Sequence, residues 1–146
     1  VLENEDDPRR QDYLARFADR EGQAFLRRFW HKYRGKTPDE MREDYDWREA
    51  FKYGVAPQPV EGYAGPLDAV TIADVEEVIA ASEGENDGPS WVCIVRLRDR
   101  RYAFLSAWCD YTGWDCQAGG DAWVHGDLDA LVQFGCTREA RERMGL

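Results

Sequence analysis

Hydrophobic positions recur at two different spacings along this chain, and the change of spacing divides it into two halves. Over residues 11–33, aromatic and aliphatic side chains recur mostly every three or four positions, which is typical of an amphipathic helix. A second helix is expected from Pro38 to about Lys52, because Thr37 can cap it and proline suits the first helical position. We therefore expect a helical N-terminal arm over residues 1–53.

Residues 54–66 contain three prolines and three glycines, and this composition predicts a loop between the two halves. An α+β core is expected over residues 67–146. It begins with a predicted helix from Thr71 to about Ser82, since the TIAD run at 71–74 resembles a capping box.

A β-hairpin is the clearest prediction for the second half. Residues 91–98 are β-branched and aromatic and then alternate, Asp99 and Arg100 can form the turn, and residues 101–108 supply the second strand. Residues 122–125 suggest a short third strand.

Short helices are expected to close the chain, capped by Asp127 and Thr137. The expected fold class is α+β in one compact domain. N-terminal helices would pack on a small antiparallel sheet built around the 91–98/101–108 hairpin, with short C-terminal helices.

Composition narrows the class of protein. Hydrophobic residues form 43% of the chain and aromatic residues 13%, which excludes a disordered protein. The formal net charge of −10 argues against direct binding to nucleic acid or to an anionic membrane, because like charges repel. No apolar run approaches the roughly 20 residues of a membrane helix.

The first residues, VLENEDDPRRQD, lack the apolar core of a signal peptide. A cytoplasmic location, in a bacterium or a phage-infected host cell, is therefore expected, with the four cysteines as thiols. The oligomeric state stays open.

Residues 108–123, WCDYTGWDCQAGGDAW, are the strongest candidate site and are called the 108–123 segment below. Three Trp and three Asp stand among three Gly, so aromatic faces that attract cations lie beside carboxylate acceptors. The alternative is that the aromatic residues form the core of a small sheet and that the Asp residues stabilise turns. The binding residues we expect are Trp108, Asp110, Tyr111, Trp114, Asp115, Gln117 and Trp123.

Evidence for catalysis or for a metal is weaker. Six residues separate Cys109 from Cys116, and His125 and Cys136 lie further on, whereas structural zinc sites usually carry ligand pairs two to four residues apart. Cys109 or Cys116 with His125 would form a nucleophile pair only if the fold brought them together. No cofactor is expected.

The basic N-terminal region is the other candidate surface. Its positive charges, interleaved with aromatic residues, suggest either a face that binds nucleic acid or a protein partner, or the solvated side of an amphipathic helix. These charges are Arg9, Arg10, Arg16, Arg20, Arg27, Arg28, Lys32, Arg34 and Lys36.

The run YAFLSAWCDYTGWDCQAGG at 102–120 resembles a motif of uncharacterised small acidic proteins from actinobacteria and their phages. The resemblance covers the chain from about Asp74 onward. It implies a source and a domain, with no activity attached to them.

Three hypotheses for function follow. The first is a non-enzymatic binding module that recognises a protein partner or a small ligand through the 108–123 segment. The second is a phage-encoded acidic inhibitor of a host nucleic-acid-handling or defence system, using Glu76, Glu77, Glu83, Glu85 and Asp87. The third is a hydrolase or metal-dependent enzyme using Asp110, Asp115, Cys116 and His125.

Overall fold

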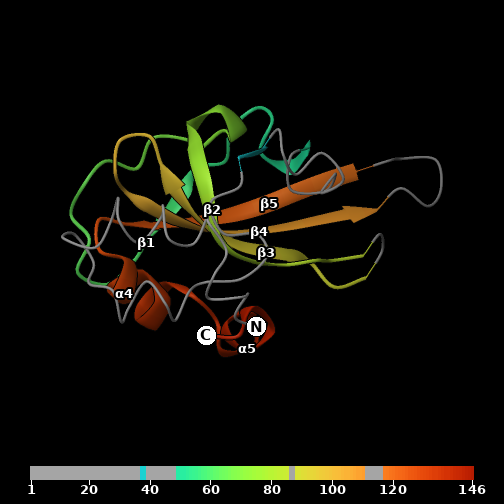
Figure 1. The fold of residues 1–146 in the computed structure, drawn as a ribbon. Helices are drawn as coiled ribbons and strands as arrows, with labels where there is room; N and C mark the ends of the chain where they lie inside the picture. The colour runs from blue at the N-terminus through green and yellow to red at the C-terminus, as the bar shows by residue number, and fades with distance from the viewer. Residues whose placement is uncertain (1–36, 39–48, 86–87, 111–116) are drawn as a thin grey trace, which may run out of the picture.

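The computed structural model describes residues 37–38, 49–85, 88–110 and 117–146, and they are organised around a five-stranded mixed sheet (Figure 1). The strand order is β1-β5-β4-β3-β2. The strands are β1 (Pro57–Pro59), β2 (Val75–Ser82), β3 (Trp91–Leu97), β4 (Tyr102–Asp110) and β5 (Gln117–His125).

Strands β3 and β4 form the expected hairpin. They pair antiparallel from Trp91 opposite Ala107 to Arg96 opposite Tyr102. The turn closes through a hydrogen bond from the Leu97 amide to the Arg101 carbonyl at 2.8 Å, and Arg100 takes a positive φ of 75° within it. All seven residues of β3 are buried, so the sheet is covered on both sides of this strand.

The segment after Thr71 differs from the prediction. The capping box is present, because the Asp74 carboxylate accepts the Thr71 amide at 2.8 Å, but it closes only the 3-10 turn η2 (Ile72–Asp74). The chain then enters β2, which pairs antiparallel with β3. The helix expected over 71–82 is therefore wrong. Pairing with a buried neighbouring strand outweighs the local helix-start signal in a run rich in Val and Ile.

Strand β5 is longer than the short strand expected at 122–125, and it lies between β4 and β1. β1 pairs parallel to it within the segment expected to be a loop at 54–66, from Pro57 opposite Ala122 to Pro59 opposite Val124. Proline lacks an amide hydrogen, so both prolines suit a strand at the edge of the sheet.

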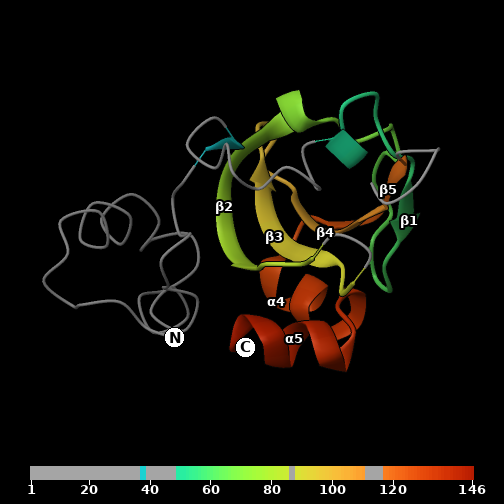
Figure 2. The same cartoon turned by 90° about the vertical axis from the view of Figure 1, so that its right-hand side faces the viewer.

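The two faces of the sheet carry separate clusters of buried side chains. On one face, called the helical face here, Ile79, Ile94 and Phe104 pack with residues of α4 (Leu128–Ala130), η3 (Leu131–Gly135) and α5 (Arg138–Met144). On the other, called the opposite face, Val95 and Leu105 pack with others of their cluster. Figure 2 shows the C-terminal helices together on one side of the curved sheet.

Local signals in the sequence do position these helices. The Asp127 carboxylate accepts the Ala130 amide at 3.0 Å and starts α4, and the Thr137 hydroxyl accepts the Ala140 amide at 3.1 Å and starts α5. Gly145, with a φ of 76°, ends α5 in the left-handed conformation.

The expected fold class is wrong. The described residues form a mostly β structure, a five-stranded mixed sheet with short helices near the C-terminus. The sheet is mixed because β1 adds a parallel pair to an otherwise antiparallel arrangement. No N-terminal helix packs on the sheet within the described part, and most of the segments 11–33 and 38–52 lies outside the described residues. No described helix is long and apolar enough to cross a membrane.

Candidate functional site

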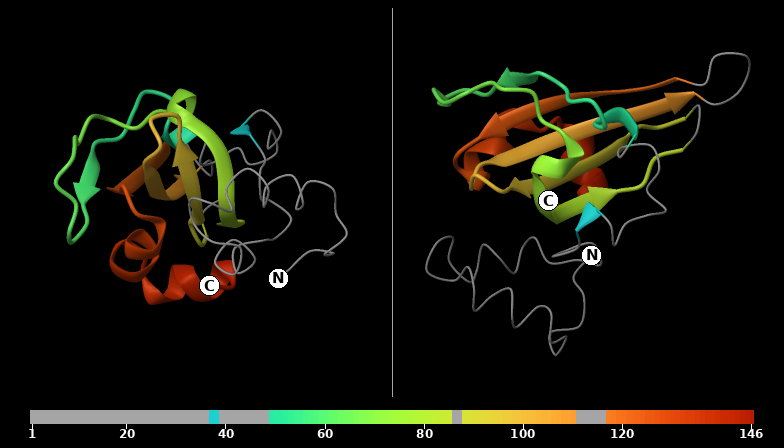
Figure 3. Two further views of the ribbon diagram at one scale, coloured as in Figure 1. Left: turned by 60° about the vertical axis from the view of Figure 1, so that its left-hand side comes forward. Right: turned by 90° about the horizontal axis from the view of Figure 1, so that it is seen from above.

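The candidate site is the part of the helical face that extends beyond the C-terminal helices along β4 and β5. These strands are nine residues long each and run side by side (Figures 1 and 3). Alternation along each strand places Ser106 and Trp108 of β4 on the helical face with Gly119 and Asp121 of β5. We call Ser106, Trp108, Gln117, Gly119 and Asp121 the open surface.

Trp108 dominates the open surface. It is a large apolar residue that remains 43% exposed. Its indole lies against Gly119, the residue directly opposite on β5. A Cβ atom on Gly119 would lie only 2.5 Å from Cζ2 and 2.9 Å from Nε1 of Trp108. Glycine at 119 thus provides the space in which the ring rests, and the contact limits the positions that the ring can take.

Gly120 leaves space for a second aromatic ring on the opposite face. A Cβ atom there would approach Cε2 of the fully buried Phe51 to 2.9 Å. Because successive strand residues point to opposite faces, the two consecutive glycines each accommodate one ring. This accounts for the Gly-Gly pair.

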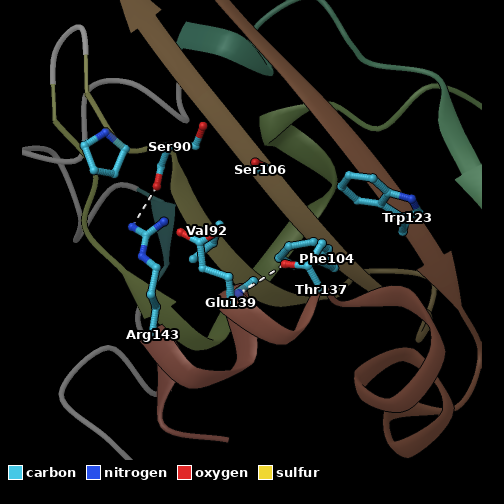
Figure 4. Close-up of a pocket in the computed structure, with 10 residues that line it drawn as sticks. Ser90, Val92, Phe104, Ser106, Trp123, Thr137, Glu139 and Arg143 are labelled. Atoms are coloured by element: carbon cyan, nitrogen blue, oxygen red, sulfur yellow. Dashed lines mark hydrogen bonds between the residues drawn. The ribbon is translucent and has the colours of Figure 1, made fainter.

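A pocket of about 190 Å³ lies beside the open surface, between the sheet and α5. Its sheet side includes Val92, Phe104, Ser106 and Trp123, as Figure 4 shows. The rings of Phe104 and Trp123 stack with centroids 5.1 Å apart and an interplanar angle of 26°. Ser106 belongs to both the pocket and the open surface, so the two are continuous.

Helix α5 supplies the other wall of the pocket, with Glu139 and Arg143 (Figure 4). Two hydrogen bonds hold Arg143 in place. Its Nη2 donates to the Ser90 carbonyl at 2.7 Å and to the Glu83 carbonyl at 3.0 Å. The Thr137 hydroxyl is occupied by its cap hydrogen bond.

The structure brings together part of the predicted site. Trp108 and Gln117 are exposed, Trp123 is half-buried against Phe104, and Asp110 ends β4 opposite Gln117. Tyr111, Trp114 and Asp115 lie outside the described residues.

The residues of the enzyme hypothesis are not brought together where they are described. Asp110 pairs with Gln117, eight residues before His125 on β5, a separation of roughly 26 Å at the usual strand rise. Cys109, the alternative nucleophile, is buried and pairs with Ala118, roughly 23 Å from His125 by the same measure. His125 Nδ1 accepts the Asp127 amide at 2.8 Å and so stabilises the turn before α4. Cys116 and Asp115 lie outside the described residues. Within the described ranges no cluster of His, Cys, Asp or Glu could hold a metal ion.

Two of the five carboxylates of the inhibitor hypothesis form ion pairs within the fold. Arg96, which is only 2% exposed, contacts Glu76 through Nε at 2.9 Å and Glu77 through Nη2. The pairing of β2 with β3 shifts register between Val75 and Glu77, and both neighbouring glutamates reach the same arginine there. Glu83 and Glu85 lie after the end of β2, and Asp87 is outside the described residues.

Reasoning from the sequence did not identify the pocket. The alternation of β4 could have placed Phe104 and Ser106 on the face of Trp108. No local signal points to Glu139 or Arg143, because they reach the site only when α5 packs on the sheet. No family model, curated protein or solved structure matches this chain.

Proposed function

We propose that this protein is a non-enzymatic binding module whose open surface recognises a positively charged segment of a protein partner. One observation carries the proposal: Trp108 is exposed and rests on Gly119, with the exposed Asp121 diagonally across the strand pair. Diagonal neighbours in such a pair lie about 7–8 Å apart.

This arrangement suits a cationic side chain. A guanidinium or ammonium group over the indole face is attracted by the ring, by about 0.5–1 kcal/mol at an exposed site. A carboxylate at the distance of Asp121 adds an attraction that a neutral ligand would not gain. Because the ring already rests on Gly119, little side-chain entropy is lost on binding.

The charge distribution supports the same partner. The chain has a formal net charge of −10, which speeds the approach of a basic partner. Several arginines of the described core bind acceptors within the fold: Arg96 binds Glu76, and Arg101 binds Asp99 at 2.8 Å. Asp121 makes no ion pair with the described residues, so its carboxylate is available.

The test is a titration with a peptide of alternating arginine and glycine whose termini are acetylated and amidated. Binding is followed through the indole N–H signals in NMR spectra. The signal of Trp108 is identified as the one lost in Trp108→Phe. We expect that signal to move on titration, and Trp108→Leu to weaken binding by about two- to fivefold, because leucine covers Gly119 but lacks the aromatic face. Asp121→Asn should also weaken binding of the peptide, and it should reduce the salt dependence of that binding.

Phe134→Leu is the matched control, since Phe134 is a second aromatic residue, 52% exposed, on the C-terminal helical segment. It should bind the peptide as the wild type does. A glutamate–glycine peptide should not bind. Binding of a neutral oligosaccharide or a mononucleotide at Trp108, with no response to the arginine peptide, would contradict the proposal.

The other hypotheses receive less support. The inhibitor hypothesis needs a row of available carboxylates, and Arg96 engages two of them. An origin in actinobacteria or their phages stays a prediction from the DYTGWDCQ motif.

A further inference from the structure

The pocket between α5 and the helical face carries opposite charges on a single wall. Glu139 and Arg143 are four residues apart on α5, so their side chains project from the same side of the helix. Within the described residues they form no ion pair with each other. Nη2 of Arg143 instead donates to two backbone carbonyls, which fixes the guanidinium in position. The wall thus holds one separated negative and one separated positive group.

The sheet side of the pocket is mostly apolar. Val92 and the stacked rings of Phe104 and Trp123 face α5, while Ser90 and Ser106 add hydroxyl groups (Figure 4). A ligand that fits must therefore combine an apolar body with polar groups on one side.

The charges and the volume narrow the ligand further. The wall is formally neutral. A cationic ligand would be attracted by Glu139 but repelled by Arg143, and an anionic ligand would meet the reverse. A zwitterion gains from both. The volume of about 190 Å³ lies below the roughly 300 Å³ at which pockets for drug-sized ligands begin. This space suits one amino acid better than a nucleotide.

We infer that this pocket binds a free α-amino acid with a large apolar side chain. The α-ammonium would be held by Glu139, the α-carboxylate by Arg143, and the side chain by Phe104, Trp123 and Val92. This site uses residues other than Trp108 and Asp121. It adds a small-molecule ligand to the proposed recognition of a basic partner.

The test uses three probes with the same side chain: L-phenylalanine, its cationic amide and its anionic N-acetyl derivative. Binding to the full chain is followed by the NMR shifts of the Ser106 and Ala140 amides. We expect saturable shifts with phenylalanine, and at least tenfold weaker binding of both derivatives. Arg143→Gln should make phenylalanine and its amide bind equally, and Glu139→Gln should make phenylalanine and its N-acetyl derivative bind equally.

Arg138 and Glu142 provide the matched control on the same helix. They pair with each other at 3.1 Å, with side chains 86% and 66% exposed, and they do not line the pocket. Arg138→Gln and Glu142→Gln should leave all three affinities unchanged. Arg143 also holds the backbone at Ser90, so thermal melting of each variant is measured first. If Arg143→Gln unfolds, the three probes on the wild type and on Glu139→Gln still decide the question.

Two results would overturn the inference: no saturable shift with phenylalanine, or a derivative that binds as tightly as phenylalanine. Trp108→Leu separates this inference from the proposed function. It should leave phenylalanine binding intact while it weakens the arginine–glycine peptide, so either proposal can fail alone.

Discussion

Trp108 rests on Gly119, its direct partner across β4 and β5, and this contact keeps a large aromatic ring at the surface of the sheet. An aromatic residue opposite a glycine covers backbone that would otherwise be exposed to water. At the proposed site the same contact orients the ring for a ligand. Stability and recognition therefore depend on one pair of residues.

Gly119→Ala should displace the indole, because the new Cβ would lie 2.5 Å from Cζ2 of Trp108. Overpacking of this kind costs about 1–3 kcal/mol. We expect a lower free energy of unfolding by urea and a changed indole N–H shift for Trp108. Gly126→Ala is the control, since no heavy atom beyond its two chain neighbours lies within 4 Å of its Cβ position. An equal loss of stability in both variants would show that backbone effects alone explain the change.

Arg96 and Glu77 form an ion pair whose side chains are 2% and 6% exposed. Arg96→Met should cost about 3–5 kcal/mol, because it leaves the Glu77 carboxylate buried without its cationic partner. The double variant Arg96→Met/Glu77→Leu should recover most of this loss, since well-packed apolar residues often replace a buried pair at little cost. Denaturant unfolding measures all of these variants.

Glu76→Gln serves as the comparison, because the Glu76 side chain is 48% exposed. Because the Glu76 carboxylate is half-exposed, its ion pair with the buried Arg96 should contribute only about 1 kcal/mol. If Arg96→Met cost no more than Glu76→Gln, the buried pair would not stabilise the sheet as argued.

The β3–β4 hairpin could be predicted because its signals are local. Strand-forming residues alternate on each side of a turn at Asp99 and Arg100, and the pairing partners are near in sequence. The same holds for the caps at Asp127 and Thr137, where one side chain binds an amide three residues away.

β2 could not be predicted in this way, because two irregularities in its pairing with β3 disturb the alternation. The register shifts between Val75 and Glu77 and again between Val78 and Ala80. The large apolar residues Val75, Val78 and Ile79 recur at the three- and four-residue spacing of a helix, although residues 77–81 are all buried in the strand. Only the partner strand, known from the structure, resolves this ambiguity.

Only part of the candidate site was predictable. Composition identified Trp108 and Gln117, which lie on adjacent strands. The pocket needs Arg143, more than thirty positions from Ser106, and its formation depends on how α5 packs against the sheet. Long-range packing of this kind leaves no pattern in a single sequence.

Cys136 should make the protein less stable in alkaline solution. Burial raises the pKa of its thiol from 9.0 to about 12, although Arg141 opposes this shift slightly. Below pH 9 the thiol is protonated in both states and has no effect on the pH dependence. Above pH 9 the unfolded chain loses the proton first, so the free energy of unfolding falls as pH rises towards 12, by up to about 1.4 kcal/mol per pH unit.

The measurement is urea unfolding under reducing conditions at several pH values from 8 to 11, for the wild type and for Cys136→Ala. The substitution lowers stability at every pH because it leaves a small cavity, but it should flatten the decline above pH 9. All other ionisable groups are the same in the two proteins, so the difference between the two slopes isolates Cys136. Parallel curves would mean that the thiol ionises equally well in the folded and unfolded states, and its burial against α5 would then have no electrostatic consequence.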